Sequence, residues 1–250
     1  MFSEAMMKPA GSAHGLADAG ISQGLGGLFR RQGLERFEPG AAVFWEGDPA
    51  AHVFQIVEGV LRICKIIADG RRVITDFLYP GDFVGLSQRE RYRCTVEAVT
   101  PVRLRRLARA RFDEGVNRSP ALRREHFARL CDSMAAAQDQ MVLLARKSAE
   151  ERVASFLLST ARRLSADLLG KPAVELPMTR LDIADHLGLT IETVSRLITR
   201  LAGRGVIAPG RRHAIVILQP GLLETLAGEG DDGGHEMIGE GYTRQAVWPN

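Results

Sequence analysis

Cysteine is scarce in this sequence, and the three cysteines, Cys64, Cys94 and Cys131, are widely spaced without a Cys-x-x-Cys pair. An odd and scattered set argues against a disulfide framework and fits the reducing cytoplasm, where we expect the protein to reside. Long apolar runs are also missing, since none approaches the roughly 18–20 residues that a membrane helix needs. The excess of positive charge is small, with 33 Lys+Arg against 30 Asp+Glu. A basic surface for nucleic acid would therefore have to be local, and we expect no membrane partner.

Histidine is sparse in the part of the chain that carries strand-like patterns. Between residues 34 and 110 the sequence has His52 alone, whereas a cupin-type metalloenzyme needs several histidines and a carboxylate on neighbouring strands. The sequence also offers no recognisable set of nucleophile, base and orienting group. We therefore expect neither an enzyme nor a metal site.

The middle of the chain has the composition of a globular protein, whereas the two ends differ from it. Residues 1–28 are rich in Gly, Ala and Ser, lack the pattern of a signal peptide and predict a flexible arm. Residues 229–250 are Gly-rich and acidic at first, and they predict a disordered tail. The 200 or so residues between them are enough for two modest domains with their own cores.

Residues 29–118 have the texture of short strands punctuated by glycine. Gly40, Gly47, Gly59, Gly70 and Gly81 arrive every seven to twelve residues, with β-favouring runs such as VFQIV and RVITDFL between them. Asp69-Gly70 between two such runs is a hairpin signal, because glycine tolerates the positive φ of a tight turn. We expect a small antiparallel barrel or roll.

Residues 119–148 predict one long helix with an apolar seam. Six residues are spaced alternately three and four apart, as in the a and d positions of a coiled coil: Phe127, Leu130, Met134, Ala137, Met141 and Leu144. A helix that packs on its own domain would also be amphipathic. The regularity over more than two heptads favours a helix that packs against its copy in a homodimer.

Residues 149–228 predict a helical unit that contains a helix-turn-helix. Thr179 can cap a first helix with Asp182 answering it, Gly188 permits a sharp turn, and Thr190 can cap a second helix. Ala184 is small where the two helices approach. Val194, Leu197, Ile198 and Leu201 would face inward, which leaves outward, toward the major groove of DNA, Ile191, Glu192, Thr193, Ser195, Arg196 and Arg200.

A basic hairpin follows these helices. Residues 206–218 read as two strands around Pro209-Gly210, and the tip carries Arg211 and Arg212, which suit phosphate contacts. We add Thr179, Arg180 and Thr190 to the expected DNA-contacting residues. A helical hairpin inside an enzyme domain, with Glu192 and Arg196 as an ordinary i,i+4 ion pair, is the alternative. In the groove the same pair has a use, because Arg donates twice to guanine and Glu accepts from a cytosine amino group.

The sequence resembles the cyclic-AMP receptor/Fnr superfamily of bacterial regulators, and within it the FixK branch. The resemblance covers about residues 29–225 and is strongest in LARKSAEERVASFLL (144–158) and LPMTRLDIADHLGLTIETVSRLITRL (176–201). It implies an α+β fold with an N-terminal β-roll of the cyclic-nucleotide-binding type, a long dimerisation helix and a C-terminal winged helix-turn-helix. It also implies an activator that works with RNA polymerase on low-oxygen, respiratory or nitrogen-related genes.

The resemblance assigns base contacts to the second helix. Fnr-like members carry Glu-x-x-Ser-Arg, which is here Glu192, Ser195 and Arg196, and their inverted repeat resembles TTGAT, four bases, ATCAA. Arg196 would meet the guanine, Glu192 the paired cytosine, and Ser195 or Ile191 a thymine nearby.

The sensor part departs from two patterns of the superfamily. Cyclic-nucleotide binders place a carboxylate where this chain has Leu86, and the later Tyr92-Arg93-Cys94 matches the phosphate-binding pattern poorly. An iron–sulfur cluster needs four cysteines, and this chain has three. We expect no cofactor. A regulator gated by haem or a nucleotide remains the alternative, with Cys64, His52 or Cys94 as a possible axial ligand.

Overall fold

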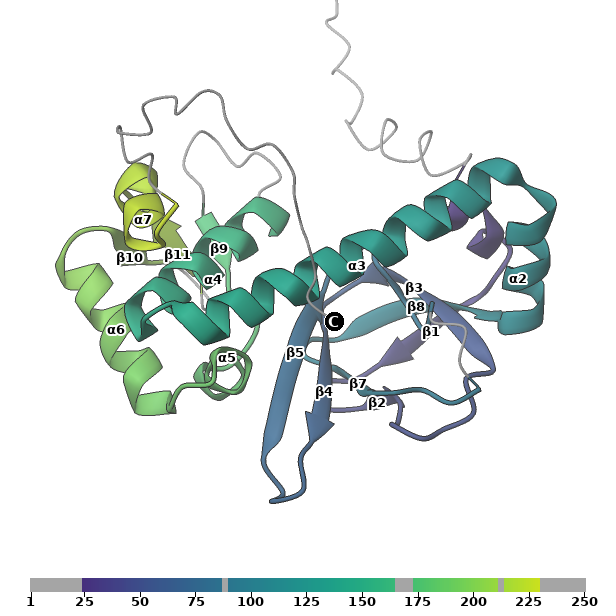
Figure 1. Ribbon diagram of the computed structural model, residues 1–250, viewed down its shortest axis with the longest axis horizontal. Coiled ribbons are helices and arrows are strands. Elements are labelled where there is room, and N and C mark those ends of the chain that lie inside the picture. The colour runs from purple at the N-terminus through teal and green to yellow at the C-terminus, as the bar shows by residue number, and fades with distance from the viewer. Residues whose placement is uncertain (1–23, 87–89, 165–172, 211–213, 230–250) are drawn as a thin grey trace, which may run out of the picture.

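The computed structural model describes residues 24–86, 90–164, 173–210 and 214–229. They form a β-rich lobe and a helical lobe, with one long helix crossing between them (Figure 1). This is the α+β architecture expected from the sequence.

The β-rich lobe is a roll of two four-stranded antiparallel sheets. One sheet has the order β1 (Leu34–Phe37), β8 (Val102–Ala108), β3 (His52–Glu58) and β6 (Phe83–Val84). The other has the order β2 (Ala42–Phe44), β7 (Thr95–Ala98), β4 (Leu61–Ile66) and β5 (Arg72–Leu78). The β4–β5 hairpin turns at the predicted Asp69-Gly70, where the Ile67 amide donates to the Arg71 carbonyl at 3.0 Å.

The core of the roll lies between these two sheets. Leu61, Val96 and Leu104 are completely buried there, and the rings of Phe44 and Tyr92 stack with centroids 3.6 Å apart. Alternate residues of each strand supply this core, as the period of two in a strand requires.

A second, smaller core covers the outside of the first sheet and corrects the expected extent of the N-terminal arm. The 3-10 helix η1 (Leu25–Phe29) buries Leu25 and Phe29 completely against Val53 and Phe112. Residues 25–28 are therefore part of the folded lobe, because Leu25 and Phe29, four residues apart, pack on this hydrophobic surface. Phe112 lies on α2 (Arg109–Arg118), a helix that we did not predict from the sequence.

The long helix α3 (Pro120–Arg146) begins at Ser119, whose hydroxyl accepts from the Leu122 amide at 3.3 Å, with Pro120 in the first turn. Its 27 residues span about 40 Å. Lys147 and Ser148 separate it from α4 (Ala149–Leu164).

The helical lobe contains α4, α5 (Arg180–Leu187), α6 (Ile191–Gly203) and α7 (Pro220–Leu226). Its sheet has the order β10 (Ile207–Pro209), β11 (Ala214–Ile217) and β9 (Ala173–Glu175), so a third strand joins the predicted two. Glu229, which we expected in the disordered tail, forms an ion pair with Arg162 at 2.9 Å. The core of this lobe also contains Ile74 and Phe77 of β5, so the two lobes are packed together. Among the described residues no helix has the length and apolar character to cross a bilayer.

Candidate nucleic-acid interface

The first helix of the predicted helix-turn-helix, α5, begins with a complete capping box. The Asp182 amide donates to Thr179 Oγ1 at 3.1 Å, and the Thr179 amide donates back to Asp182 Oδ2 at 3.1 Å. Two amides that a helix leaves without intrahelical partners are thereby satisfied. The predicted cap is confirmed, and it fixes where α5 starts.

The turn between the helices depends on Gly188. Its φ of +63° lies in the left-handed region, and the Leu189 amide donates back to the Ala184 carbonyl at 3.1 Å. Arg152 of α4 secures the turn from outside, because its guanidinium donates to the Leu187, Leu144 and Lys147 carbonyls at 2.8 to 3.0 Å. The turn is thus connected to the end of α3 through one side chain.

The second helix, α6, begins at Thr190, whose hydroxyl accepts from the Thr193 amide at 3.2 Å. Val194, Leu197 and Leu201 are buried at spacings of three and four against α4 and α5, while Ile198 is half-buried. The inward face is therefore the one predicted, and it holds the opposite face of α6 away from the protein.

That opposite face carries the predicted base-reading residues. Glu192, Ser195 and Arg196 are exposed and Ile191 is 40% exposed, while Thr193 is half-buried, with its hydroxyl 3.1 Å from that of Thr190. We call Ile191, Glu192, Ser195 and Arg196 the reading face. Four side chains of suitable chemistry thus lie together in the first turn and a half of one helix, where a recognition helix contacts base edges.

The charge of Glu192 suits hydrogen-bond acceptance. Hydrogen bonds from its own amide and from the Thr190 hydroxyl, together with the Arg196 charge, lower the pKa of the Glu192 carboxyl. An ionised carboxylate accepts and cannot donate, as contact with a cytosine amino group requires. Arg196 Nη2 lies 3.5 Å from Thr193 Oγ1 and is otherwise open to solvent.

The remaining residues predicted to contact DNA differ in their exposure and in the partners that they already have. Thr179 is exposed and Arg180 is half-buried at the start of α5. Arg200 is exposed but lies 4.0 Å from Glu150 of α4, which also binds Arg204 at 3.0 Å. Arg211 and Arg212 fall outside the described residues.

Sequence reasoning missed residues at two places. Thr199 is exposed one turn beyond Ser195, and its hydroxyl donates to the Ser195 carbonyl at 3.0 Å. Its place on the outward side of α6 could have been found from the helical period. The other set joins α5 to the β4–β5 hairpin through Arg62, Arg72 and Asp182, and no local pattern could have indicated it.

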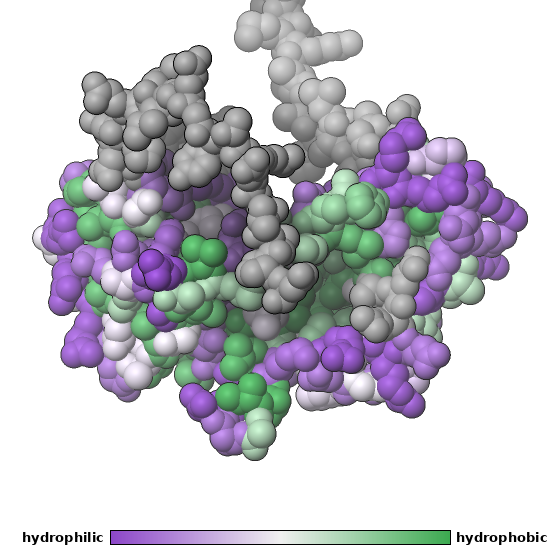
Figure 2. Space-filling model, in the orientation of Figure 1, coloured by the Kyte–Doolittle hydropathy of each residue, from purple (hydrophilic) through white to green (hydrophobic). Residues whose placement is uncertain are grey.

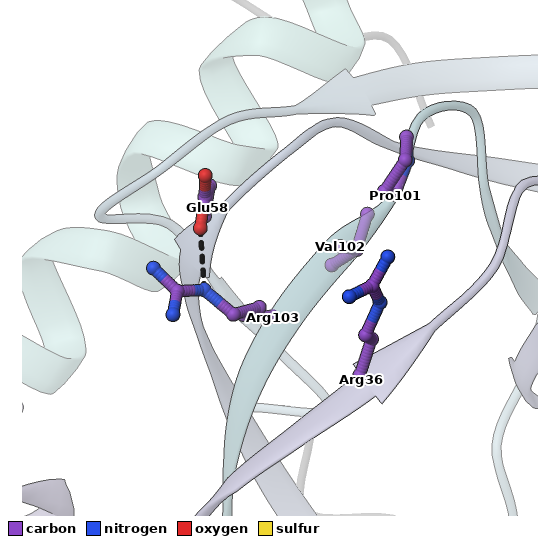
Figure 3. Close-up of a pocket in the computed structure, with 5 residues that line it drawn as sticks. All are labelled: Arg36, Glu58, Pro101, Val102 and Arg103. Atoms are coloured by element: carbon purple, nitrogen blue, oxygen red, sulfur yellow. Dashed lines mark hydrogen bonds and ion pairs between the residues drawn. The ribbon is translucent and has the colours of Figure 1, made fainter.

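The β-rich lobe contains a hollow of about 350 Å³, which is lined by Arg36, Glu58, Pro101, Val102 and Arg103. Figure 3 shows Arg103 directed at Glu58, with which it forms an ion pair, while Arg36 of β1 pairs with Glu38. The charged groups of this hollow are therefore already engaged with each other or with neighbours.

Two of the candidate haem ligands are thiols inside the fold, Cys64 buried and Cys94 half-buried. Burial raises the pKa of the Cys64 thiol to about 11 and also raises the pKa of the Cys94 thiol, so both remain protonated at neutral pH. Cys64 packs in the core shared with the helical lobe. Leu86, at the position where the resemblance places the carboxylate of cyclic-nucleotide binders, packs on the small core of Leu25 and Phe29. Among the described residues, no group of three or more His, Cys, Asp or Glu could hold a metal ion.

Comparison with known proteins agrees with this geometry. The profile of the cyclic nucleotide-binding domain matches residues 34–119, and that of the Crp-like helix-turn-helix domain matches residues 151–226. The nitrogen fixation regulation protein FixK of Bradyrhizobium diazoefficiens is 41% identical over 191 residues, covering 76% of this chain and 80% of that protein. The transcriptional activator protein FnrL of Cereibacter sphaeroides is 38% identical over 203 residues, covering 79% and 82%. The structure of FixK2 from Bradyrhizobium japonicum superposes with a TM-score of 0.74 at 35% identity, covering 78% of this chain and 96% of that one.

A winged helix-turn-helix with an exposed reading face, joined by a long helix to a β-roll, defines a DNA-binding transcription regulator. The chain belongs to the Crp/Fnr superfamily of such regulators, in its FixK-like branch. The expectation that it is not an enzyme is confirmed, because these relatives regulate transcription.

Proposed function

We propose that this protein is a homodimeric activator that binds an inverted repeat of the type TTGAT, four bases, ATCAA, without a bound effector. The observation that carries the proposal is the reading face, in which Glu192, Ser195 and Arg196 project from the capped start of α6. Arg196 donates to guanine O6 and N7, Glu192 accepts from the paired cytosine, and Ser195 or Ile191 contacts a neighbouring thymine.

Support for the homodimer comes from the seam of α3. Phe127, Met134 and Met141 are 64–69% exposed, and residues 131–139 are all exposed in the single chain. Hydrophobic residues lie along part of the course of α3 between the lobes (Figure 2). Exposed apolar stripes of this regularity mark association surfaces, and a two-fold pairing of α3 would cover the stripe. Leu144 is the exception, because its side chain also approaches the turn at Gly188.

The names of the relatives suggest the setting in which the protein acts. FixK proteins regulate nitrogen fixation and FnrL is a transcriptional activator, as their names state. We therefore assign to this chain low-oxygen, respiratory or nitrogen-related target genes, RNA polymerase as a partner, and the cytoplasm as its location. Mapping of the sites bound in cells identifies the genes.

A gel-shift titration tests the proposal. Metal-free and nucleotide-free protein in air is expected to bind the TTGAT palindrome and not a scrambled duplex. Arg196→Ala is expected to lose about 1–3 kcal/mol and the preference at the guanine. Arg204→Ala is the matched control, since Arg204 follows α6 and pairs with Glu150, far along the helix from the reading face.

Two results would contradict the proposal. Specific binding that appears only after an effector is added, or only without oxygen, identifies an effector-gated regulator instead. An Arg196 variant with undiminished discrimination at the guanine removes the assignment of the base contact.

A further inference from the structure

A cluster of five charged residues joins the roll to α5. Arg62 of β4 lies 2.7 Å from Glu97 of β7 and 3.0 Å from Asp182 of α5. Arg72 of β5 lies 2.7 Å from Asp182 and 2.8 Å from Asp185. We call these five residues the interlobe cluster.

The interlobe cluster is shielded from water. The Asp182 side chain is 3% exposed, and the other four side chains are between 15% and 23% exposed. Charges removed from water require close partners, and removal of one partner leaves the other charge unpaired. The cluster is therefore stable in one arrangement, and the two lobes cannot shift against each other without breaking it.

Asp182 connects this cluster directly to the start of α5. Its Oδ2 atom accepts from the Thr179 amide and hydroxyl, and its Oδ1 atom accepts from Arg62 and Arg72. One carboxylate thus holds the capping box with one oxygen and the roll with the other.

The far end of α5 is held as well. His186 Nδ1 lies 3.1 Å from the Ile74 carbonyl of β5, and Gln140 Nε2 of α3 donates to the His186 carbonyl at 2.9 Å. Both the roll and the long helix therefore form hydrogen bonds with α5, while the reading face on α6 stays exposed. An arrangement that leaves both the reading face and the seam of α3 open is compatible with a dimer on DNA.

We propose that Arg62 and Arg72 are positioning residues that fix the angle between α6 and α3, and that this angle selects the spacing of the two half-sites. The inference rests on the proposed dimeric binding to a palindrome. In such a dimer α3 lies at the two-fold axis, so the angle sets how far apart the two reading helices lie. One additional base pair between half-sites moves one of them by about 3.4 Å and rotates it by about a tenth of a turn. A rigidly held α6 cannot follow that displacement.

The experiment compares palindromes with four and five bases between the half-sites. The measured quantity is the dissociation constant for the five-base spacer divided by that for the four-base spacer, for each protein variant at one salt concentration. The wild-type protein is expected to prefer the four-base spacer. Arg72→Ala is expected to lower that ratio by about fivefold, because the loosened lobe follows the longer spacer. Its preference for guanine over other bases within each half-site should be unchanged, which a general loss of folding would not allow.

Arg71→Ala is the matched control. Arg71 neighbours Arg72 on the same hairpin, and its substitution removes the same charge. Its side chain is 77% exposed, however, and its ion pair within the described part of the chain is with Asp69 of the turn. Its spacer ratio should equal that of the wild type. Asp185→Asn is a milder second variant that leaves the capping box intact, and it should lower the ratio in the same direction if Arg72→Ala does not fold.

The possible outcomes separate the two proposals. A wild-type protein without preference for the palindrome over scrambled DNA overturns the proposed function and this inference with it. If the wild-type protein prefers the palindrome over scrambled DNA but Arg72→Ala and Asp185→Asn have the same spacer ratio as the wild type, this inference alone is overturned. Tighter binding of Arg72→Ala to both spacers also overturns it, because the cluster would then restrain binding.

Discussion

Substitution of Gly188 by alanine tests how the helix-turn-helix turn is built. An alanine in the left-handed region costs about 1–2 kcal/mol relative to its preferred conformations. The added Cβ would lie 3.6 Å from Arg152 Nη1 and 3.7 Å from Leu144 Cδ2, which are ordinary contacts. Alanine also restricts the unfolded chain, and this loss of conformational entropy stabilises the folded state by about 0.4–1 kcal/mol. We expect Gly188→Ala to lower the free energy of unfolding by about 0–1.6 kcal/mol.

Gly59 provides the contrast, because it combines a positive φ with close neighbours. A Cβ there would lie 2.3 Å from the Pro101 carbonyl oxygen and 2.8 Å from Val102 Cγ2. The backbone would have to move, so Gly59→Ala should cost about 3 kcal/mol or more. Gly70, with φ +83° and no atom within 4 Å of the added Cβ, is the control for the backbone term alone.

Urea unfolding followed by circular dichroism, at one protein concentration, gives the three differences in free energy. The expected order is a small loss for Gly70→Ala and Gly188→Ala and a large loss for Gly59→Ala. A Gly59 variant as stable as the Gly70 variant would refute the steric reasoning. A loss above about 3 kcal/mol for Gly188→Ala would show that the turn requires more than a positive φ.

Three further outcomes are expected. The double variant Leu130→Glu and Met134→Glu should be monomeric in light scattering and bind the palindrome weakly, whereas a dimer of unchanged affinity would rule out the seam. Arg211→Ala or Arg212→Ala should weaken binding to all sequences alike and reduce its salt dependence, and a sequence-selective loss would count against phosphate contact. Burial lowers the pKa of His186, so the unfolded state binds more protons and stability should fall as the pH drops below about 6.5. His186→Gln should reduce that slope in thermal melts at pH 5.5 to 8, and an unchanged slope would place the titrating group elsewhere.

Local chemistry made the helix-turn-helix predictable from sequence. The hydroxyls of Thr179 and Thr190 cap the helices that follow them, and the missing side chain of Gly188 permits the left-handed conformation of the turn. The inward face of α6 followed from the spacing of Val194, Leu197 and Leu201, and the structure buries all three. These features depend on neighbours within four residues, so the sequence contains them completely.

Features that depend on distant partners could not be predicted in the same way. The 3-10 helix η1 is Gly-rich and resembles the arm before it, and it is ordered because Leu25 and Phe29 find the surface formed by Val53 and Phe112. Strand β9 is three residues long and pairs with β11, about forty positions further along the chain. Neither segment has a hydrophobic period long enough to indicate its structure.

Asp182 shows where local reasoning ends. As the partner in a capping box it explains two hydrogen bonds, both made by Oδ2. A capping residue at an exposed helix start would leave the second oxygen in water, and nothing more would be required. Here the side chain is almost completely buried, so the second oxygen needs donors, and a buried carboxylate requires positive charge nearby. Arg62 and Arg72 meet that requirement from 120 and 110 residues away. The burial of Asp182, which only the fold reveals, is therefore the reason that two arginines of the β-rich lobe act, in our proposal, as positioning residues for the DNA-binding helices.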